Sequence, residues 1–364
     1  DLPLEEVGIP EGVREVVGRR LSYLDQATND VLAAAAVIGR EFELAVLASI
    51  VDGGREVALD ALDAAESSSL VAPGTGGPGS YRFAHALVRT TLYEELPTSR
   101  RLRLHRDVAR ALAARSDADL RLSELARHFA EAAALGEVDN AVVWGRRAGA
   151  AAASELAWEE AVTHFDRALD ALALADDVDP LTRADLLLDL GAALRAISDD
   201  RAEPILTEAI ELARRADDPA RFADGVLTLC NDRFLRELGT DDRRLALIDE
   251  ARSGLDPGDD GRRARLLSAR AGELMWSPEH EQRRRLSDQA LEIARNLDDR
   301  EVLAEVLGQR GYVFDSVDVN SLDGYLDDYT EVIDLARDLG DRQLLCRSLL
   351  ARAPALIMCG ERAA

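Results

Sequence analysis

Apolar residues recur at helical spacing from the first residues onward, and each run ends at a residue that breaks helices. The segment 13–24 places its valines and leucines on one helical face. The next run, 31–38, is apolar almost all round, which predicts a buried helix that ends at Gly39. Two further helices are expected over 43–51 and 56–69.

The period of the pattern changes after residue 69. The tripeptides 70–72 and 81–83 are short and rich in strand-forming residues, and the intervening sequence PGTGGPGS at 73–80 is typical of a turn. A further helix is expected over 85–96. Several helices followed by a two-stranded hairpin are typical of a winged helix, so we predict a winged-helix domain over residues 1–97.

Only helical patterns follow residue 98, and they repeat. Equivalent positions recur at intervals of 41, 42, 39 and 42 residues, at Ala168, Ala209, Ala251, Ala290 and Val332. Similar phrases accompany the repeat, namely ARRADD, ARNLDD and ARDLGD. Repetition at about 40 residues indicates stacked helix pairs. We therefore predict a predominantly all-α chain, in which residues 98–364 form tetratricopeptide-like helical repeats arranged as an α-solenoid.

Small and aromatic residues support this interpretation. Gly149, Ala161, Phe165 and Ala168 occupy the places where tetratricopeptide repeats carry small and aromatic side chains. A small residue on one helix lets the next helix approach closely, and the aromatic ring fills the groove toward the neighbouring unit. The last helical pattern, 341–358, has no second helix behind it, so we expect the array to be truncated or to continue in disorder.

The composition and charge of the chain argue against several classes of function. The 69 acidic and 44 basic residues give a formal charge of −25, and every basic residue is arginine. Such a chain is a poor partner for nucleic acid or an anionic membrane as a whole. It has no apolar stretch of about 18 residues and no signal sequence. The three scattered cysteines have no metal-ligand spacing, so we expect a cytoplasmic protein without a bound metal.

No set of residues typical of a catalytic site is apparent. A phosphate-binding GxxxxGK[ST] loop is impossible without lysine. His280 and Glu281 precede three consecutive arginines at 283–285, but a zinc-protease pattern would need a second histidine, and a solvated, ion-paired face is the better interpretation. His105, His128 and His164 are expected to be packed or surface residues. Repeated Asp pairs, at 176–177, 217–218 and 298–299, are expected to cap helices. We predict that this chain is not an enzyme and holds no cofactor.

Two groups of side chains are candidates for binding. Tryptophan is enriched at binding hot spots, which makes Trp144, Trp158 and Trp276 a candidate partner or effector surface, with packing inside the repeats as the alternative. An arginine cluster is the second group, and either faces phosphate or pairs with acids of neighbouring helices. Its members are Arg100, Arg101, Arg103, Arg106 and Arg110, with Arg19 and Arg20.

The stretch YRFAHALVR at 81–89, followed by Tyr93, Leu96-Pro97, Arg101, Leu104-His105 and Ala109, is distinctive. It resembles the segment after the ATPase module in large ATP-binding regulators of the LuxR type, which are relatives of MalT among the signal-transducing ATPases with numerous domains. The upstream stretch from Ile9 and the downstream helices from 125 to 172 are similar to the winged helix and repeats of the same family. Beyond about residue 240, the resemblance depends on the repeat alone.

This resemblance implies an ATP-dependent transcriptional regulator, of which the present chain holds the winged helix and the sensor repeats. The ATPase module that binds ATP or ADP and the DNA-binding helix-turn-helix would lie outside it. The resemblance also implies that His85 reads the phosphates of the bound nucleotide, with Arg89 supporting it from one turn further along. The alternative for His85 is to cap the helix that it begins. Partners implied are the protein's own ATPase module and an effector or protein on the repeats.

The same combination of modules also occurs, by resemblance, in multidomain nucleotide cyclases and signalling kinases. A protein-binding scaffold in such a protein is therefore the alternative function. The sequence does not identify the effector, the promoter, the oligomeric state, the output domain or the face of the solenoid that binds.

Overall fold

The computed structural model describes residues 18–230, 241–275, 277–310 and 322–358. The described chain is mostly helical with one small antiparallel sheet, which confirms the expected fold class. It forms two compact units, Asp1–Ala148 with Asp170–Asp176 (unit 1) and Gly149–Leu169 with Asp177–Ala364 (unit 2). The predicted domain boundary after residue 97 stays a prediction.

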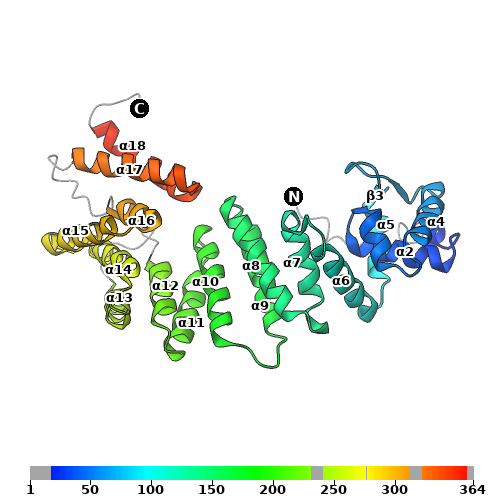
Figure 1. Ribbon diagram of the computed structural model, residues 1–364, viewed down its shortest axis with the longest axis horizontal. Helices are drawn as coiled ribbons and strands as arrows, with labels where there is room; N and C mark the ends of the chain where they lie inside the picture. The colour runs from blue at the N-terminus through cyan, green and yellow to red at the C-terminus, as the bar shows by residue number, and fades with distance from the viewer. Residues whose placement is uncertain (1–17, 231–240, 276, 311–321, 359–364) are drawn as a thin grey trace. The chain divides into compact units, whose positions relative to one another are not determined.

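Unit 1 begins as a winged helix, in which three helices alternate with three short strands (Figure 1). The order is α2 (Gln26–Ile38), β1 (Glu41–Glu43), α3 (Leu44–Ile50), α4 (Gly54–Ser67), β2 (Val71–Pro73) and β3 (Ser80–Phe83). The strands pair antiparallel in the order β1-β3-β2, with Phe42 opposite Tyr81 and Val71 opposite Phe83. The predicted hairpin is therefore confirmed as β2 and β3, whereas β1 was not predicted, because three residues are too few to show a period.

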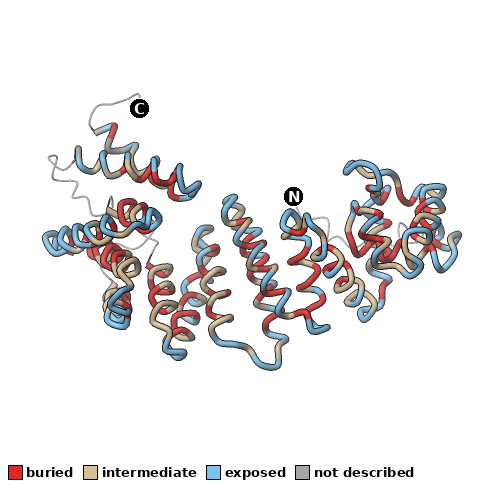
Figure 2. The backbone as a smooth tube through the Cα atoms, in the orientation of Figure 1, coloured by how far each residue is buried: buried red, intermediate tan, exposed pale blue. Residues whose placement is uncertain are grey.

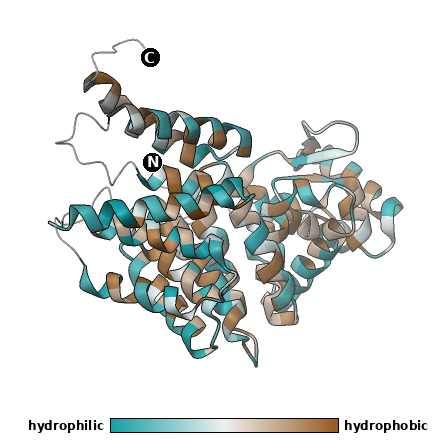
Figure 3. Ribbon diagram, turned by 60° about the vertical axis from the view of Figure 1, so that its left-hand side comes forward, coloured by the Kyte–Doolittle hydropathy of each residue, from teal (hydrophilic) through white to brown (hydrophobic). Residues whose placement is uncertain are grey.

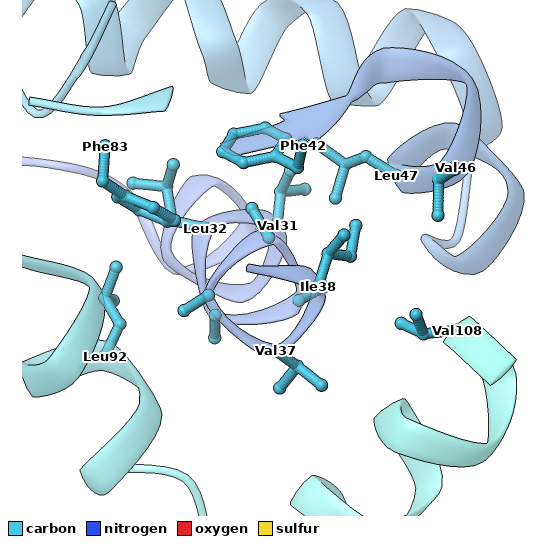
Figure 4. Close-up of a cluster of buried hydrophobic side chains, with 14 of the residues drawn as sticks. Val31, Leu32, Val37, Ile38, Phe42, Val46, Leu47, Phe83, Leu92 and Val108 are labelled. Carbon is cyan, nitrogen blue, oxygen red and sulfur yellow. The ribbon is translucent and has the colours of Figure 1, made fainter. Parts of the chain in front are cut away.

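Helix α2 is the centre of this domain because its sequence leaves almost no polar face. Residues 31–38 are all buried, as their pattern predicts. Figure 4 shows side chains from β1, α3, β3 and later helices arranged around α2, among them Phe42, Leu47 and Phe83. The rings of Phe42 and Phe83 lie 5.5 Å apart, so they close the sheet side of this core.

The loop between β2 and β3 is held by a carboxylate of β1. Glu41 Oε1 accepts hydrogen bonds from the amides of Thr75 and Gly76 at 2.5 and 3.1 Å, and from the Ser80 hydroxyl at 3.1 Å. These donors lower the pKa of Glu41, with the Thr75 amide as the largest cause. A side chain at Gly74 would collide with Ser80 and Glu41, so the glycine is needed for this close approach.

Helical segments complete both units. Unit 1 continues with α5 (Ala86–Glu94), α6 (Thr98–Ala113), the 3-10 turn η1 (Ala118–Leu120), α7 (Leu122–Glu131), η2 (Ala133–Leu135) and the start of α8 (Val138–Ser154). The remaining helices are α9 (Trp158–Leu172), α10 (Pro180–Ala196), α11 (Ala202–Arg215), α12 (Pro219–Cys230), α13 (Asp242–Gly254), α14 (Asp260–Glu273), α15 (His280–Asn296), α16 (Arg300–Arg310), α17 (Leu322–Leu339) and α18 (Arg342–Met358).

The helices of unit 2 pack as consecutive pairs, as the 40-residue repeat predicts. Burial follows one side of outer helices such as α11, whereas α14 is buried on several sides (Figure 2). Figure 3 shows apolar and polar residues alternating along the helices. Small residues stand at the contacts: a Cβ placed on Gly149 would lie 2.3 Å from Phe165 Cε1, and one on Gly191 would lie 2.5 Å from Leu206 Cδ2. The predicted role of Gly149 in close helix approach is confirmed, and Gly191 has the same role one repeat later.

Ion pairs connect each repeat of unit 2 to the next. Arg221 on α12 binds Asp185 on α10 through Nε at 2.7 Å, and Arg262 on α14 binds Asp224 on α12 through Nε and Nη2 at 2.7 and 2.8 Å. Each arginine also holds the aspartate that caps its own helix, at Asp218 and Asp259 respectively. These caps are 2.7 and 3.0 Å away. We call this series the arginine ladder.

A second row runs along the other helices of the pairs. Arg214 on α11 binds both carboxylate oxygens of Glu250 on α13, at 2.8 and 2.9 Å, and Arg295 on α15 binds Glu331 on α17 at 3.2 Å. Bidentate arginine–carboxylate geometry fixes the relative position of two helices as well as attracting them. Many acidic residues of unit 2 are therefore held in ion pairs with arginines of other helices.

We expect opposite effects from alanine at two helical glycines. Gly191→Ala should lower the free energy of unfolding by about 1–3 kcal/mol, because the new methyl group overlaps Leu206. Gly324 on α17 is the matched control, because a Cβ there meets nothing within 4 Å. Gly324→Ala should raise stability by about 0.5–1 kcal/mol through helix propensity. Urea unfolding followed by circular dichroism measures both, and effects of equal sign would contradict this packing.

The arginine ladder predicts a salt-dependent loss of stability. Arg262→Gln should lower the free energy of unfolding by about 1 kcal/mol at low salt, because a partly exposed bidentate pair is lost. The deficit should shrink in 1 M NaCl, where exposed charges are screened. Arg215→Gln is the control, since Arg215 is exposed at the end of α11. A deficit that is the same in both salt conditions would assign the effect to packing rather than charge.

Candidate functional site

A chain of buried and half-buried polar side chains joins three helices of unit 1. Tyr93 on α5, His105 on α6 and His128 on α7 lie in sequence, and Arg127 completes the row. The distances are 3.0 Å from Tyr93 Oη to His105 Nε2, 3.0 Å between the two histidine Nδ1 atoms, and 2.7 Å from His128 Nε2 to Arg127 Nη2. Both histidines are fully buried. We call these four residues the histidine relay.

The hydrogen bonds of the relay have two self-consistent directions, because His128 faces both a donor, Arg127, and an acceptor, the carbonyl of Ile38. In one arrangement His105 donates from Nε2 to the Tyr93 hydroxyl oxygen, and in the other the Tyr93 hydroxyl donates to His105 Nε2. Both arrangements keep the two imidazoles neutral.

Burial keeps both imidazoles neutral. It lowers the pKa of His105 to about 3, with the charges of Arg127, Arg101 and Arg89 adding to the effect. The pKa of His128 is lowered well below its usual value by burial first, and then by Arg127 and His105. A proton added to either ring would have to replace one hydrogen bond of the relay. These groups are therefore not poised for general acid–base catalysis near neutral pH.

The relay is anchored on the carboxyl end of α2. Arg127 Nη2 donates to the carbonyl of Ile38 at 3.0 Å, and Arg89 Nε on α5 donates to the carbonyl of Ala36 at 3.0 Å. Both carbonyls belong to the last turn of α2, where no amide of the same helix is available. Burial, together with the charge of Arg89, lowers the pKa of Arg127. One helix end therefore holds residues of α5 and α7.

His85 lies where the sequence places it, directly before α5. It occupies the N-cap position and is exposed, but its side chain makes no capping hydrogen bond. The capping alternative is therefore wrong, and the nucleotide-sensing role stays a prediction. Arg89 does not bind His85 in the structure, since its described hydrogen bond goes to Ala36.

The three tryptophans do not form one described surface. Trp144 is half-buried in unit 1, where it stacks on Phe129 at 6.4 Å and supports Arg147, whose guanidinium carbon lies 4.4 Å from the ring centroid. Trp158 packs in a core cluster of unit 2. Trp276 lies outside the described residues. Packing thus accounts for the two tryptophans that are described, and their use as a partner surface stays a prediction.

Ion pairing accounts for much of the predicted basic cluster. Arg100 binds Asp30 at 2.7 Å, Arg110 binds Glu137 at 2.5 Å, and Arg106 binds Asp107 at 3.1 Å. The alternative of pairing with acids of neighbouring segments is therefore confirmed for Arg100 and Arg110, whereas Arg106 pairs with the next residue of its own helix. Arg101 is different, because its guanidinium carbon lies 5.3 Å from the centroid of the Tyr93 ring.

The other candidate residues have structural roles. Asp218 accepts from the amide of Arg221 at 2.9 Å, and Asp299 accepts from that of Val302 at 3.0 Å, as expected for caps. Near His280, the prediction of a solvated arginine face is wrong for Arg283, which is buried and donates to the carbonyl of Met275 at 2.8 Å.

The described residues contain no group of histidine, cysteine and acidic side chains that would hold a metal ion. In the same part of the chain, no helix is long and apolar enough to cross a membrane.

Sequence reasoning did not bring the relay together. Tyr93, His105 and His128 are 12 and 23 residues apart, and neither spacing shows that their rings meet across three helices. The available signal was weak: each lies on an otherwise apolar helical stripe, at a place where a polar group needs a partner.

No protein-family model matches the chain, and no curated protein does. Among solved structures, the chain is similar to the crystal structure of a Signal Transduction ATPase with Numerous Domains (STAND) protein with a tetratricopeptide repeat sensor from Pyrococcus horikoshii. The two are 13 % identical, with a TM-score of 0.43 over 95 % of this chain and 55 % of that one. The chain thus spans about half the length of that protein.

The relay predicts that unit 1 loses stability as the pH falls below about 6.5. The unfolded chain has ordinary histidines and binds protons there, whereas the folded pKa of His105 is about 3 and that of His128 is also depressed. The unfolded state therefore gains protons first. Between pH 7 and 5.5 the loss should be about 1 kcal/mol for each of these histidines.

Urea unfolding followed by the fluorescence of Trp144, with Trp158 and Trp276 changed to phenylalanine, measures this loss in unit 1. His105→Gln with His128→Gln should remove the pH dependence, whatever the stability at pH 7. If the free energy of unfolding falls equally with pH in the double variant and in its parent, groups other than these two histidines cause the loss. The window lies above the range in which ordinary carboxylates titrate.

Proposed function

We propose that this chain is the winged-helix and sensor-repeat region of an ATP-dependent transcriptional regulator of the STAND class. The observation that carries the proposal is the exposed His85, which stands at the start of α5 directly after the last strand of a complete winged helix. An imidazole there can donate to a phosphate oxygen of a nucleotide held by a neighbouring module. ATP or ADP would bind that ATPase module, and this chain is non-catalytic and holds no cofactor in the proposal.

The charge of the winged helix supports DNA binding by another part of the protein. In helix-turn-helix folds the second helix enters the major groove, and here that helix is α4. Its exposed face carries four acids, with Arg55 as the basic residue. The acids are Glu56, Asp60, Asp63 and Glu66. Phosphates would repel this face, so we propose that the domain transmits a signal instead of reading DNA.

The repeats are proposed to bind an effector or a protein partner in the cytoplasm. The arginine ladder already uses the basic side chains between repeats, which leaves the surface acidic. A surface cavity of about 420 Å³ on α17 is lined by Asp327, Glu331, Asp334 and Asp338, with Arg300 of α16 at its edge. Such a surface favours a cationic partner.

His85→Ala in the full-length protein should weaken ADP binding about tenfold or more, because a hydrogen bond to a charged phosphate is lost. Isothermal titration calorimetry measures the affinity. His280→Ala is the control, because His280 is an exposed histidine of unit 2. Unchanged ADP affinity in His85→Ala would remove the nucleotide-sensing role.

A second measurement addresses the output. The chain alone should show no sequence-specific binding to duplex DNA at physiological salt, whereas the full-length protein should bind its promoter. Specific binding by the chain alone would assign DNA reading to this winged helix. If the full-length protein carries a cyclase or kinase domain, the proposed sensor role remains and the proposed transcriptional output is rejected.

A further inference from the structure

Three arginines gather around Tyr93, and no carboxylate of the described residues forms an ion pair with them. The guanidinium carbons of Arg101 and Arg89 lie 5.3 and 5.7 Å from the centroid of the ring, and Arg127 belongs to the relay that ends on the Tyr93 hydroxyl. All three are half-buried. Among the described residues, none of them has an acid within ion-pair distance. The arginine ladder of unit 2 shows the opposite arrangement, in which each arginine binds two acids.

Acids on the adjoining helix act on this group from a distance, the charge of Glu131 on both Tyr93 and Arg127, without a described ion pair. Glu124 and Glu131 of α7 are exposed, and their charges reach Arg127, but the ion pair described for Glu124 is with Arg121. The remaining polar neighbours are the two neutral histidines and the α2 carbonyls already bound by Arg89 and Arg127. Like charges held together in a partly desolvated place without a counter-ion are unfavourable.

The atoms of these arginines that make no described hydrogen bond are all donors. The Nε of Arg101 is buried and has no partner. Arg89 uses only Nε and Arg127 only Nη2 in their described hydrogen bonds. A set of several donors with three positive charges is complementary to an oxyanion with two negative charges.

We propose that Arg101, Arg89 and Arg127, which lie around Tyr93, form a binding site for a phosphate-type oxyanion. The ligand is inorganic phosphate or the phosphate group of a small monoester. Because its residues come from α5, α6 and α7, an occupied site ties the end of the winged helix to the two helices that follow it. The proposal for this site does not depend on the role of His85, and the two are tested by different variants.

Arg101→Gln is the decisive variant, because Arg101 makes no described hydrogen bond to the fold. Arg103→Gln is its matched control: it removes the same charge from the same helix, at an exposed position. Inorganic phosphate, titrated into the whole chain at pH 7.5 and constant ionic strength, should bind the wild type and Arg103→Gln alike. In Arg101→Gln the affinity should fall at least tenfold, as expected for loss of a charge-assisted hydrogen bond.

Calorimetry gives the affinity, and the Nε–H resonance of Arg101 in a ¹⁵N spectrum should shift on binding. Equal affinity in Arg101→Gln and Arg103→Gln, or no binding to the wild type, would overturn the site. If Arg101→Gln does not fold, Arg101→Lys keeps the charge and removes the planar fork, and it should still weaken binding several-fold. Tighter binding of glucose 6-phosphate than of phosphate identifies a monoester site, and equal binding identifies a site for phosphate itself.

Discussion

The carboxyl end of α2 is the point on which unit 1 is built. Residues 31–38 are apolar on all sides, so the helix has to lie inside the domain, and its last carbonyls lie inside with it. Buried carbonyls need donors, and the polypeptide supplies them from two other helices through Arg89 and Arg127. Arg127 also contacts His128, so the same helix end holds the histidine relay in place.

Unit 2 is held together by close contacts at small residues and by ion pairs between its repeats. Its helix pairs approach closely at small residues such as Gly191, where the neighbouring leucine occupies the space of a side chain. Stacked pairs then need a fixed register, and Arg221 and Arg262 provide it by binding one acid on their own helix cap and one on the preceding repeat. The acidic residues thereby become part of the packing instead of a uniform surface charge.

These two devices give the units different electrostatics. In unit 2 the charges are distributed in pairs, with acids left over on α17. Around Tyr93 in unit 1, by contrast, no acid in the described part of the chain forms an ion pair with the arginines, and the imidazoles are neutral. In the proposed sensor, the Tyr93 group is the place where an external anion would change the balance between helices. The acidic face of α4 makes the usual DNA-reading role of a winged helix unfavourable.

The sequence by itself determined the fold class, the repeat and most helix positions, because these follow from periodicity and from residues such as Gly39, Gly191 and the capping aspartates. It also placed His85 at the start of its helix. Strand β1 was not predicted, because three residues are too few to show a period. Its role depends on the contact of Glu41 with Thr75 in the loop between the other two strands. Only the tertiary structure brought His105 to His128, since contacts between side chains distant in the sequence depend on how helices pack and not on local pattern.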